Sequence, residues 1–453
     1  MASEPRTPAG EAEEMRADGE AVRRILKARE PIGWRLGLER MRRLCSLLGM
    51  PQHRFASIHV VGTNGKTSVA RMTMALLEAH RVSAGAYVSP HISSWRERIL
   101  IRGEPISEDL FAQVLERAEQ SAQVADRSAG EEGPVTQFEL VTAAAFLAFA
   151  EARVRVAVIE AGLGGRLDAT NVIPSKVTVL TSIGLDHTEW LGESVEEIAA
   201  EKLAVLRDHT TLIHGEVPDE VRPVISRELG RRHARRPASS PASAVTLPPG
   251  MPDPLPGYQA ENMGLAVAAV REVLDTRLLD AASVIVAAEN PIAGRAQLVS
   301  GEPPVIYDAA HNPDGARALA ELLEELVPPR TVRRGLRRRE ERRGVICCLA
   351  ILAEKDALGI VEALAPACSR FVCTEIPEDA IRGSGRPVGQ SHPASALAEL
   401  CRKAGAEAEA VEDPLEAWAR THELARELDG AALAAGSHYL LTCLWTERPA
   451  PSS

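Results

Sequence analysis

A glycine-bearing turn between an apolar run and a helix-like pattern is the segment of this sequence best suited to chemistry. Residues 58–61 (Ile-His-Val-Val) are predicted to form a buried strand, and the residues after the turn show helical apolar spacing. The turn reads Gly-Thr-Asn-Gly-Lys, ends at Lys66 and is followed by two hydroxyl residues, Thr67 and Ser68. Backbone N–H groups of such a turn point at an anion, a lysine adds a point charge and a hydroxyl reaches a metal ion. The sequence therefore predicts a phosphate-binding loop at residues 62–68.

The loop departs from the usual Walker pattern at one position. With Lys66 as the lysine, that pattern requires glycine at position 60, where this chain has Val60. The alternative is a strand-turn-helix connection that carries Gly-Lys-Thr without binding phosphate. We favour the phosphate loop because strand, glycines, lysine, paired hydroxyls and helix follow one another in the required order.

A carboxylate at the end of another apolar run is the second candidate. Glu160 follows residues 156–159 and precedes a glycine-rich segment, residues 161–171. Open α/β sheets bind ligands at the carboxyl ends of their parallel strands, and a carboxylate is a hard oxygen ligand that suits Mg²⁺. A buried, ion-paired glutamate is the alternative. The next apolar run leads to His187, which we expect to pair with Glu160 across adjacent strand ends.

Short β-branched runs alternate with longer Ala/Leu/Glu patterns through almost the whole chain, which predicts an α/β fold with parallel sheets covered by helices. The expected strands are residues 58–61, 154–161, 177–183, 211–214, 305–308, 345–351, 371–374 and 439–444. The expected helices are residues 68–80, 107–119, 138–152, 195–206, 262–274 and 314–326. Residues 120–133 and 231–257 are expected to be loops.

The length of 453 residues exceeds what one hydrophobic core usually organises. A turn-prone segment at residues 290–295 separates two sets of expected strands. We therefore predict a larger domain over residues 1–295 and a smaller α/β domain over residues 296–453.

The composition favours a soluble globular protein, with 45% apolar and 25% charged residues. A net charge of −11 disfavours non-specific binding to nucleic acid or acidic lipid. Eight arginines fall within residues 330–343, which could form a polyanion site. We interpret this run as a solvated loop, because no aromatic residues interleave with the arginines for base stacking.

No apolar stretch is long enough to span a membrane, and the acidic N-terminus does not resemble an export signal. The seven cysteines include no C-x-x-C pair and no zinc-finger spacing. We expect reduced thiols and a cytoplasmic protein.

The phosphate loop, Gly-Thr-Asn-Gly-Lys-Thr, resembles the variant loop of the Mur ligase superfamily, and its flanks look like the folate branch, the folylpolyglutamate synthases and dihydrofolate synthases. The resemblance runs from residues 36–40 to residues 436–440. Thr67 stands where the folate branch usually has glycine and the cell-wall members have threonine. A ligase acting on a UDP-linked cell-wall precursor therefore stays open, although the segment before the loop is short for a UDP-binding domain. A non-catalytic nucleotide-binding relative is the other alternative.

The resemblance implies a large N-terminal ATPase domain containing the phosphate loop and a smaller Rossmann-like C-terminal domain. The implied ATP-binding residues are Thr63, Asn64, Gly65, Lys66, Thr67, Ser68, Asn262, Arg295 and Asp308. The implied metal ligands are Ser89, Glu160, His187 and Lys202, the last as a carbamate. The implied pterin-site residues are Thr136, Gln137, Phe138, Glu139, Leu167, Asp168 and Ala169, although Phe138 could instead be a core residue at a helix start.

The activity that the resemblance implies is ATP-dependent amide formation between L-glutamate and dihydropteroate or a folylpolyglutamate. The carboxylate would be activated as an acyl phosphate, giving ADP and phosphate, with Lys66, His187 and Lys202 in catalytic roles. The implied cofactors are ATP and Mg²⁺, as two ions, with a possible monovalent cation. Only small-molecule partners are expected, with neither nucleic acid nor membrane, and the protein is expected to be a monomer.

Overall fold

The computed structural model describes residues 19–236, 255, 257–276, 279–289, 292–327, 330–334, 337–341, 344–383 and 389–445. These residues form two compact units. The N-terminal unit holds the described residues up to 255 and from 259 to 289, and the C-terminal unit holds residues 257–258 and the described residues from 292 onward.

A seven-stranded sheet with the order β4-β3-β2-β5-β1-β6-β7 forms the centre of the N-terminal unit. Its strands are β1 (Ala56–Val61), β2 (Ala84–Tyr87), β3 (Ile99–Ile101), β4 (Glu104–Pro105), β5 (Val156–Glu160), β6 (Val177–Leu180) and β7 (Thr211–His214). Strands β2, β5, β1, β6 and β7 are parallel to one another. Strands β3 and β4 are added antiparallel at the edge next to β2. Because β5 and β6 flank β1, the residues that follow these three strands meet at one edge of the sheet.

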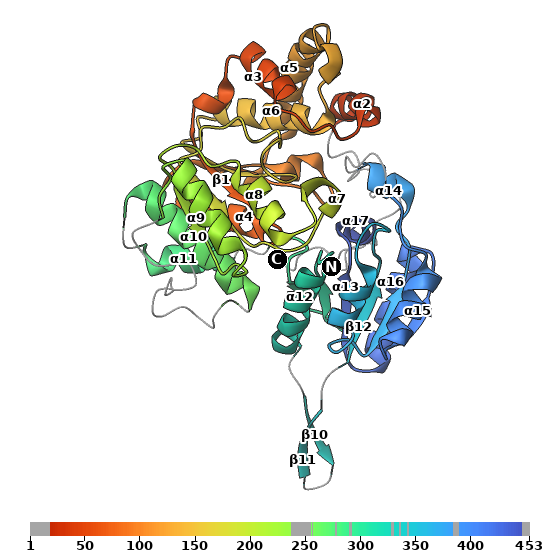
Figure 1. Cartoon of the computed structure of the whole chain (residues 1–453). Helices are drawn as coiled ribbons and strands as arrows, with labels where there is room; N and C mark the ends of the chain where they lie inside the picture. Colours follow the sequence, from red (N-terminus) through yellow and green to blue (C-terminus); the bar gives the residue numbers. More distant parts are fainter. Residues whose placement is uncertain are drawn as a thin grey trace, which may run out of the picture. The chain divides into compact units, whose positions relative to one another are not determined.

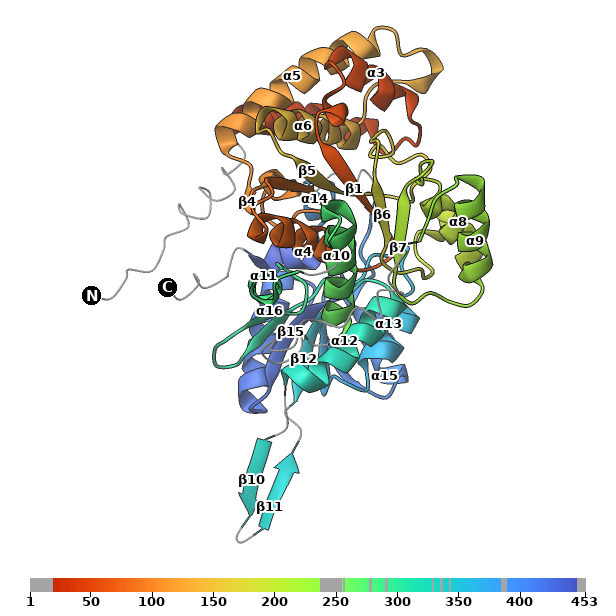
Figure 2. The ribbon, with the colours of Figure 1, turned by 90° about the vertical axis from the view of Figure 1, so that its left-hand side faces the viewer.

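Helices cover both faces of this sheet (Figures 1 and 2), with α2, α3, α5 and α6 on one side and α4, α10 and α11 on the other. The helices of the unit are α2 (Glu20–Arg29), α3 (Glu39–Leu47), α4 (Lys66–Ala79), α5 (Glu108–Asp126), α6 (Gln137–Glu151), α7 (Thr188–Leu191), α8 (Val195–Leu203), α9 (Val221–Arg231), α10 (Tyr258–Leu274) and α11 (Ala281–Ala288). Short 3-10 turns lie at Glu30–Ile32, Pro51–His53, Trp95–Arg98 and Gly130–Glu132.

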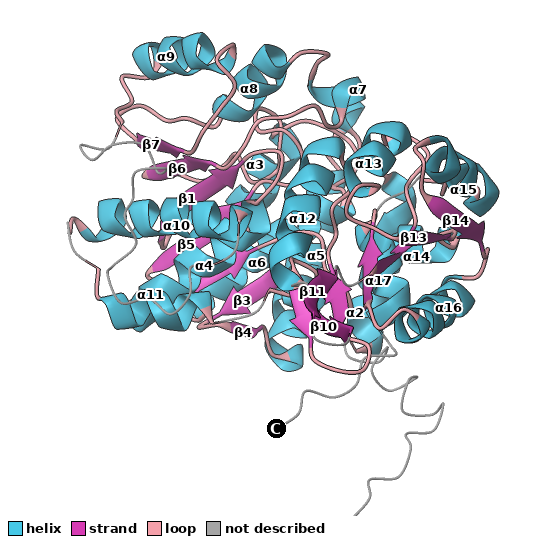
Figure 3. Cartoon of the chain, turned by 90° about the horizontal axis from the view of Figure 1, so that it is seen from below, coloured by secondary structure: helices cyan, strands magenta, loops and turns pink. Residues whose placement is uncertain are grey.

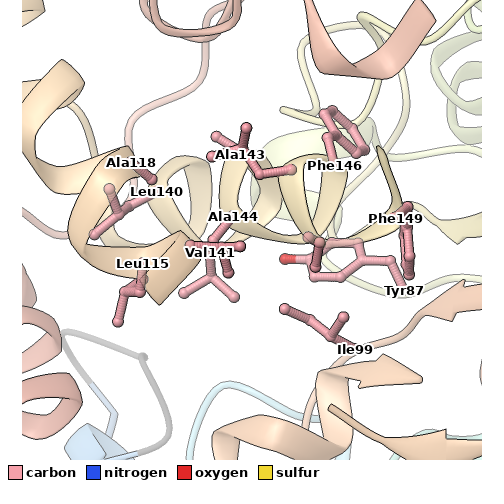
Figure 4. Close-up of a cluster of buried hydrophobic side chains, with 14 of the residues drawn as sticks. Tyr87, Ile99, Leu115, Ala118, Leu140, Val141, Ala143, Ala144, Phe146 and Phe149 are labelled. Atoms are coloured by element: carbon pink, nitrogen blue, oxygen red, sulfur yellow. The ribbon is translucent and has the colours of Figure 1, made fainter. Parts of the chain in front are cut away.

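Helix α6 is buried between the sheet and the outer helices, and its sequence is apolar on nearly every side. Phe146 and Phe149 of this helix and Tyr87 of β2 belong to one cluster of buried side chains (Figure 4). Each large apolar side chain buried in this way stabilises the fold by about 1.5–3 kcal/mol. Helix α6 is thus held in the unit by side chains that are buried along most of its length.

The C-terminal unit contains a six-stranded sheet with the order β14-β13-β12-β15-β9-β8, in which β8 alone is antiparallel to its neighbour. Figure 3 shows β13 and β14, the two strands at one end of this sheet. The strands are β8 (Gln297–Val299), β9 (Val305–Tyr307), β12 (Val345–Leu349), β13 (Arg370–Cys373), β14 (Glu407–Ala410) and β15 (Ala431–Ala435). The helices are α12 (Pro313–Leu326), α13 (Ala357–Leu364), α14 (Glu378–Gly383), α15 (Ala394–Lys403), α16 (Pro414–Glu427) and α17 (His438–Leu444).

The predicted α/β class is confirmed, but three predicted segments are wrong. Residues 439–444 belong to helix α17, where Ser437 accepts a hydrogen bond from the backbone N–H of Tyr439 and begins the helix. Much of the loop expected at residues 120–133 is helical, because α5 continues to Asp126. The arginine-rich run contains the paired strands β10 (Arg330–Arg334) and β11 (Arg337–Glu341) rather than a loop.

Most of the other expected loop, residues 231–257, lies outside the described residues, as do residues 290 and 291 of the expected domain boundary. Within the described part of the chain, no helix combines the length and the apolar character needed to cross a membrane.

Candidate active site

The predicted phosphate loop connects β1 to α4 as a tight turn. Gly65 adopts φ +83° at the N-terminus of α4, a left-handed conformation that glycine adopts without strain. A side chain on Gly62 would come within 1.9 Å of the Thr181 hydroxyl, so only glycine fits there. The Lys66 ammonium donates to the carbonyl oxygens of Gly62 (3.1 Å) and Thr63 (3.0 Å). The loop thus places a cation and a helix N-terminus at the carboxyl edge of the sheet.

The residues that follow β6 hold this loop, a role that sequence reasoning missed. The Thr63 hydroxyl donates to the Gly184 carbonyl (3.2 Å), and the Ser182 carbonyl accepts from the Thr63 N–H (2.9 Å). The Thr181 hydroxyl donates to the Asn64 carbonyl (2.5 Å). These residues looked like the end of an apolar run in the sequence, and only the pairing of β6 with β1 shows that they support the loop.

Thr67, Ser89 and Glu160 lie together beside the loop. The Thr67 hydroxyl lies 3.0 and 3.1 Å from the two Glu160 carboxylate oxygens, and the Ser89 N–H donates to one of them (3.1 Å). Glu160 is buried, with 2% of its surface exposed. The described residues contain no group of three or more His, Cys, Asp or Glu side chains that could hold a metal ion. A cation at this cluster of oxygen atoms would thus draw remaining ligands from phosphates or water, as Mg²⁺ usually does.

His187 lies at the same sheet edge, but the prediction that its strand is adjacent to that of Glu160 is wrong. Strand β1 lies between β5, which ends at Glu160, and β6, which precedes His187. His187 adopts a left-handed conformation (φ +50°) at the start of α7, and its Nε2 is 4.0 Å from the Asp186 carboxylate. Asp186 was not among the predicted site residues, although its position next to His187 in the sequence could have indicated it.

Lys202 of α8 is buried, and its Nζ donates to the Gly62 carbonyl (2.8 Å), which also accepts from Lys66. Burial, together with the charge of Lys66, lowers the pKa of Lys202 to about 7. Burial thus favours the neutral form of this amine, which is the form that reacts with CO₂.

Most of the side chains predicted for the pterin site hold the backbone around it. The Thr136 hydroxyl accepts from the Glu139 N–H (3.2 Å), and the Glu139 carboxylate accepts from the Thr136 N–H (2.8 Å), which is a capping box at the start of α6. The Gln137 amide donates to the Leu26 carbonyl (2.9 Å). Phe138 is partly exposed, and its ring lies 6.1 Å from the ring of Tyr87. Of these four residues, Phe138 is the one with an apolar surface to offer a ligand.

The glycine-rich segment after β5 is organised by Asp168. Its buried carboxylate accepts from the backbone N–H groups of Leu163 (2.8 Å) and Thr170 (2.9 Å). Burial raises the pKa of Asp168, while these hydrogen bonds favour the charged form. Ala169 is buried, whereas Leu167 is 40% exposed. Leu167 is therefore the predicted residue of this segment with the most surface available to a ligand.

The remaining predicted nucleotide residues are divided between the units. Asn262 of α10 packs against the phosphate loop, since a Cβ on Gly65 would lie 2.5 Å from the Asn262 side-chain oxygen. Ser68 is buried, and among the described residues its hydroxyl has no hydrogen-bond partner. In the C-terminal unit the Asp308 carboxylate accepts from the Tyr258 hydroxyl (2.8 Å) and the Ala296 N–H (2.7 Å).

Arg295 lies near Asp308 within the C-terminal unit, and its guanidinium donates to the Gly294 carbonyl (2.9 Å). Burial raises the pKa of Asp308, and the charge of Arg295 acts in the opposite direction. The two residues form a local electrostatic pair, to which Tyr258 adds a hydrogen bond.

Comparison with protein families finds two matches. Residues 60–214 match the Mur ligase middle domain, and residues 294–438 match the Mur ligase, glutamate ligase domain. The first match contains the phosphate loop, Glu160 and Lys202, and the second contains Arg295 and Asp308.

Individual relatives are also similar over most of the chain. The dihydrofolate synthase/folylpolyglutamate synthase of Mycobacterium tuberculosis is 37% identical over 374 residues, which cover 74% of each protein. A crystal structure of Mycobacterium tuberculosis folylpolyglutamate synthase complexed with ADP and AMPPCP has a TM-score of 0.81 at 30% identity, covering 97% of this chain and 99% of that one. A bifunctional folylpolyglutamate synthase/dihydrofolate synthase with Mn, AMPPNP and L-glutamate bound has a TM-score of 0.74 at 26% identity, covering 93% of this chain and 96% of that one.

Proposed function

Because this chain belongs to the Mur ligase family, in the branch of the dihydrofolate synthases and folylpolyglutamate synthases, we propose that its phosphate loop activates an acceptor carboxylate for attack by L-glutamate. The protein is an ATP-dependent ligase that forms a carbon–nitrogen bond and uses a divalent metal ion. The observation that carries the assignment of residues is the meeting of Lys66, Thr67 and Glu160 at one sheet edge.

The reaction requires activation because hydroxide is a poor leaving group from a carboxylate. A carboxylate oxygen of dihydropteroate or a folylpolyglutamate attacks the γ-phosphorus of ATP, the bond to the β-phosphate oxygen breaks and ADP leaves. The glutamate α-amine then attacks the acyl phosphate carbon, forming the amide and releasing phosphate and a proton. The chain has to position these groups and stabilise charge, and no protein nucleophile is needed.

Lys66 and the backbone N–H groups of residues 63–68 bind the phosphates. The oxygen atoms of Thr67, Ser89 and Glu160 suit a hard cation and would hold one Mg²⁺ ion. When bound, Mg²⁺ neutralises charge on the transferring phosphoryl group. Asn262, Arg295 and Asp308 complete the nucleotide contacts in this proposal, while Phe138 and Leu167 supply apolar surface to the pterin.

A second Mg²⁺ ion would be held by His187 and by Lys202 after carbamylation, in which the amine adds to CO₂ and loses a proton. The buried Nζ of Lys202, with its pKa lowered to about 7, favours this reaction. We expect ¹³C-bicarbonate to give a carbamate signal by NMR in the native protein but not in Lys202→Gln, and kcat to fall in that variant. A wild-type protein that is fully active without any carbamate would contradict this role.

One assay tests the acceptor. The purified protein is given ATP, Mg²⁺ and L-glutamate with dihydropteroate, tetrahydrofolate or a UDP-muramoyl substrate, and phosphate release is followed. We expect activity with one or both pteridine acceptors, none with Lys66→Ala, and a raised acceptor KM for Phe138→Ala. Activity with the UDP-linked substrate alone would support the cell-wall alternative. ATP binding without ADP formation from any mixture would support a non-catalytic relative.

We further propose a monomeric cytoplasmic enzyme whose partners are small molecules. The seven free cysteines support a reducing compartment, since six of them are buried and the structure contains no disulfide among the residues it describes. Light scattering on the purified protein checks the monomer, with a mass near 48.7 kDa as the expected result.

A further inference from the structure

The start of helix α6, which carries Phe138, is held from outside by an arginine of helix α3. The Arg40 Nε lies 3.0 Å from each carboxylate oxygen of Glu139. Both side chains are buried, with 5% of Arg40 and 3% of Glu139 exposed. Glu139 belongs to the capping box described above, so the ion pair fixes the carboxylate that caps the first turn of α6.

The same guanidinium connects two further segments of backbone. Its Nη1 donates to the Glu132 carbonyl (3.0 Å), just before α6, and its Nη2 donates to the Arg35 carbonyl (2.5 Å), just before α3. Planar guanidinium groups are suited to such fixed multiple bonding, whereas an ammonium is not. Arg40 therefore joins the segment before α3 to residues 132–139 at the start of α6, a region that lies 92 to 99 residues further along the chain.

A second buried arginine supports the same turn independently. Arg29 of α2 donates to the Val135 carbonyl (2.8 Å) and to the Asp126 carboxylate (2.9 Å), which in turn accepts from the Val135 N–H (2.8 Å). The backbone leading into α6 is thus held on two sides by residues that precede the phosphate loop.

The ring of Phe138 depends on this support for its position. It lies against Gly162, where a Cβ would come within 2.5 Å of the ring, and 6.1 Å from the ring of Tyr87. Neighbouring residues Thr136 and Gln137 are committed to backbone hydrogen bonds. A change in the direction of the first turn of α6 would therefore move the ring relative to the glycine-rich segment.

We propose that Arg40 is a positioning residue for the acceptor, which acts through Glu139 to place Phe138 and so sets acceptor affinity without contributing to nucleotide binding. This inference rests on the proposed role of Phe138 in the pterin site. The phosphate loop has its own supports, Thr181, Ser182 and Gly184, and none of the contacts of Arg40 described above involves them.

The variants have to separate an effect on positioning from an effect on folding. Removal of Arg40 or Glu139 alone would leave the charge of the other buried and unpaired, which destabilises the fold. Arg40→Lys keeps the charge but cannot bond the same set of acceptors. The double variant Arg40→Met with Glu139→Gln removes both charges together. Arg42→Met is the matched control, since Arg42 lies on the same helix in an exposed pair with Glu39.

Steady-state kinetics with dihydropteroate, ATP and L-glutamate test the proposal. For Arg40→Lys we expect the KM for dihydropteroate to rise about tenfold, with kcat and the KM for ATP within about twofold of wild type, since a loss of substrate binding raises KM alone. The double variant should show a similar rise, and Arg42→Met none. An unchanged acceptor KM in Arg40→Lys, or an equal rise in the KM for ATP, would overturn the proposal.

Hydrogen exchange distinguishes a failure of the positioning role of Arg40 from a failure of the proposed function. If the wild-type protein forms no ADP with dihydropteroate and glutamate, the proposed function is wrong, and the kinetic test does not apply. Faster exchange at residues 132–139 in Arg40→Lys than in Arg42→Met, with equal exchange at residues 62–68, still supports positioning by Arg40. Equal exchange at both segments in the two variants refutes it.

Discussion

Thr67 is the phosphate-loop residue whose hydroxyl lies against the Glu160 carboxylate. It lies within hydrogen-bond distance of both oxygens of Glu160 and stands where the folate branch usually has glycine. In the proposed site the Thr67 hydroxyl is one of the oxygen ligands of Mg²⁺, so we expect Thr67→Ala to raise the Mg²⁺ concentration for half-maximal rate by about tenfold. Because the carboxylate remains, kcat at saturating Mg²⁺ should stay close to wild type.

The control for this prediction is Glu160→Gln, which removes the negative charge. Turnover in that variant should be lost at any Mg²⁺ concentration. A Mg²⁺ titration that is unchanged in Thr67→Ala would show that the hydroxyl does not act at the metal site.

His59 makes the stability of the N-terminal unit sensitive to acid. It is fully buried in β1, its Nε2 is 2.9 Å from the Thr170 hydroxyl, and burial, together with the charge of Arg207, lowers its pKa from 6.5 to about 3. Between these values the unfolded state binds a proton that the folded state does not, so stability falls as the pH falls below 6.5. The loss should be about 2 kcal/mol at pH 5, at 1.36 kcal/mol per unit of pKa difference.

Denaturant unfolding of wild type and His59→Gln at pH 7 and pH 5 measures this effect. The glutamine has no proton to gain, so its variant should lose about 2 kcal/mol less than wild type between the two pH values. Equal losses in the two proteins would mean that His59 is not the group responsible.

Residues whose roles depend on sequence neighbours could be predicted, and residues whose roles depend on distant partners could not. The position of Lys66 at the end of a glycine turn and of Glu160 at the end of a strand was evident locally, and the structure brings both to one sheet edge. Glu139 was predicted to be a site residue because it lies in a family motif. Its partner Arg40 is 99 residues away, and only the folded chain reveals that Glu139 pairs with Arg40 and caps the first turn of α6.

At the scale of elements, Gly165 sets how closely the glycine-rich segment approaches helix α8. A Cβ at this position would lie 2.7 Å from the Lys202 carbonyl and 2.8 Å from the Glu201 carbonyl, both backbone atoms. We expect Gly165→Ala to displace α8, to lower the free energy of unfolding by about 1–3 kcal/mol and to reduce kcat. Urea unfolding and steady-state kinetics measure the two effects.

Gly230→Ala is the matched control for that substitution. Gly230 lies within α9, and a Cβ there would have no atom within 4 Å. Alanine is favoured over glycine in a helix by about 1 kcal/mol, so this variant should be as stable as wild type or more stable, with unchanged kinetics. If Gly165→Ala behaved in the same way, the close approach would have no importance for the site.

Long helical patterns and most short apolar runs were assigned correctly, but one short apolar run was assigned to the wrong type of element. The helix expected at residues 138–152 is α6 to within one residue at each end. Residues 439–444 were expected to be a strand, but a short apolar run does not distinguish a strand from a buried helix, and Ser437 begins a helix there. The last strand of the chain is β15, which was not predicted from the sequence. Its five residues are mostly alanine, so its β-structure comes from its central place in the sheet rather than from propensity.

At the scale of the whole molecule, each of the two units has buried hydrophobic clusters of its own. One cluster of buried side chains includes Tyr87, Phe146 and Phe149 of the N-terminal unit, and a separate cluster includes Phe371 and Leu397 of the C-terminal unit. The length and the turn-prone segment at residues 290–295 predicted more than one domain, because a single core rarely organises so long a chain. The supports of the phosphate loop could not be predicted in this way, since they depend on strand order.

Because each unit has its own core, we expect the ligand-free protein to unfold in two steps rather than one. Hydrogen exchange during a guanidinium titration resolves the steps, with β1 and α6 reporting on the N-terminal unit and β12 and β15 on the C-terminal unit.

Ligand binding to the folded state stabilises it by about 2.7 kcal/mol at a hundredfold excess over Kd. Mg²⁺ and ADP should therefore shift the step of the unit that carries Lys66, and Lys66→Ala should remove the shift while leaving the ligand-free titration unchanged. Simultaneous loss of protection in both units without ligand would contradict separate unfolding. A ligand-induced shift that persists in Lys66→Ala would mean that the phosphate loop is not the main nucleotide site.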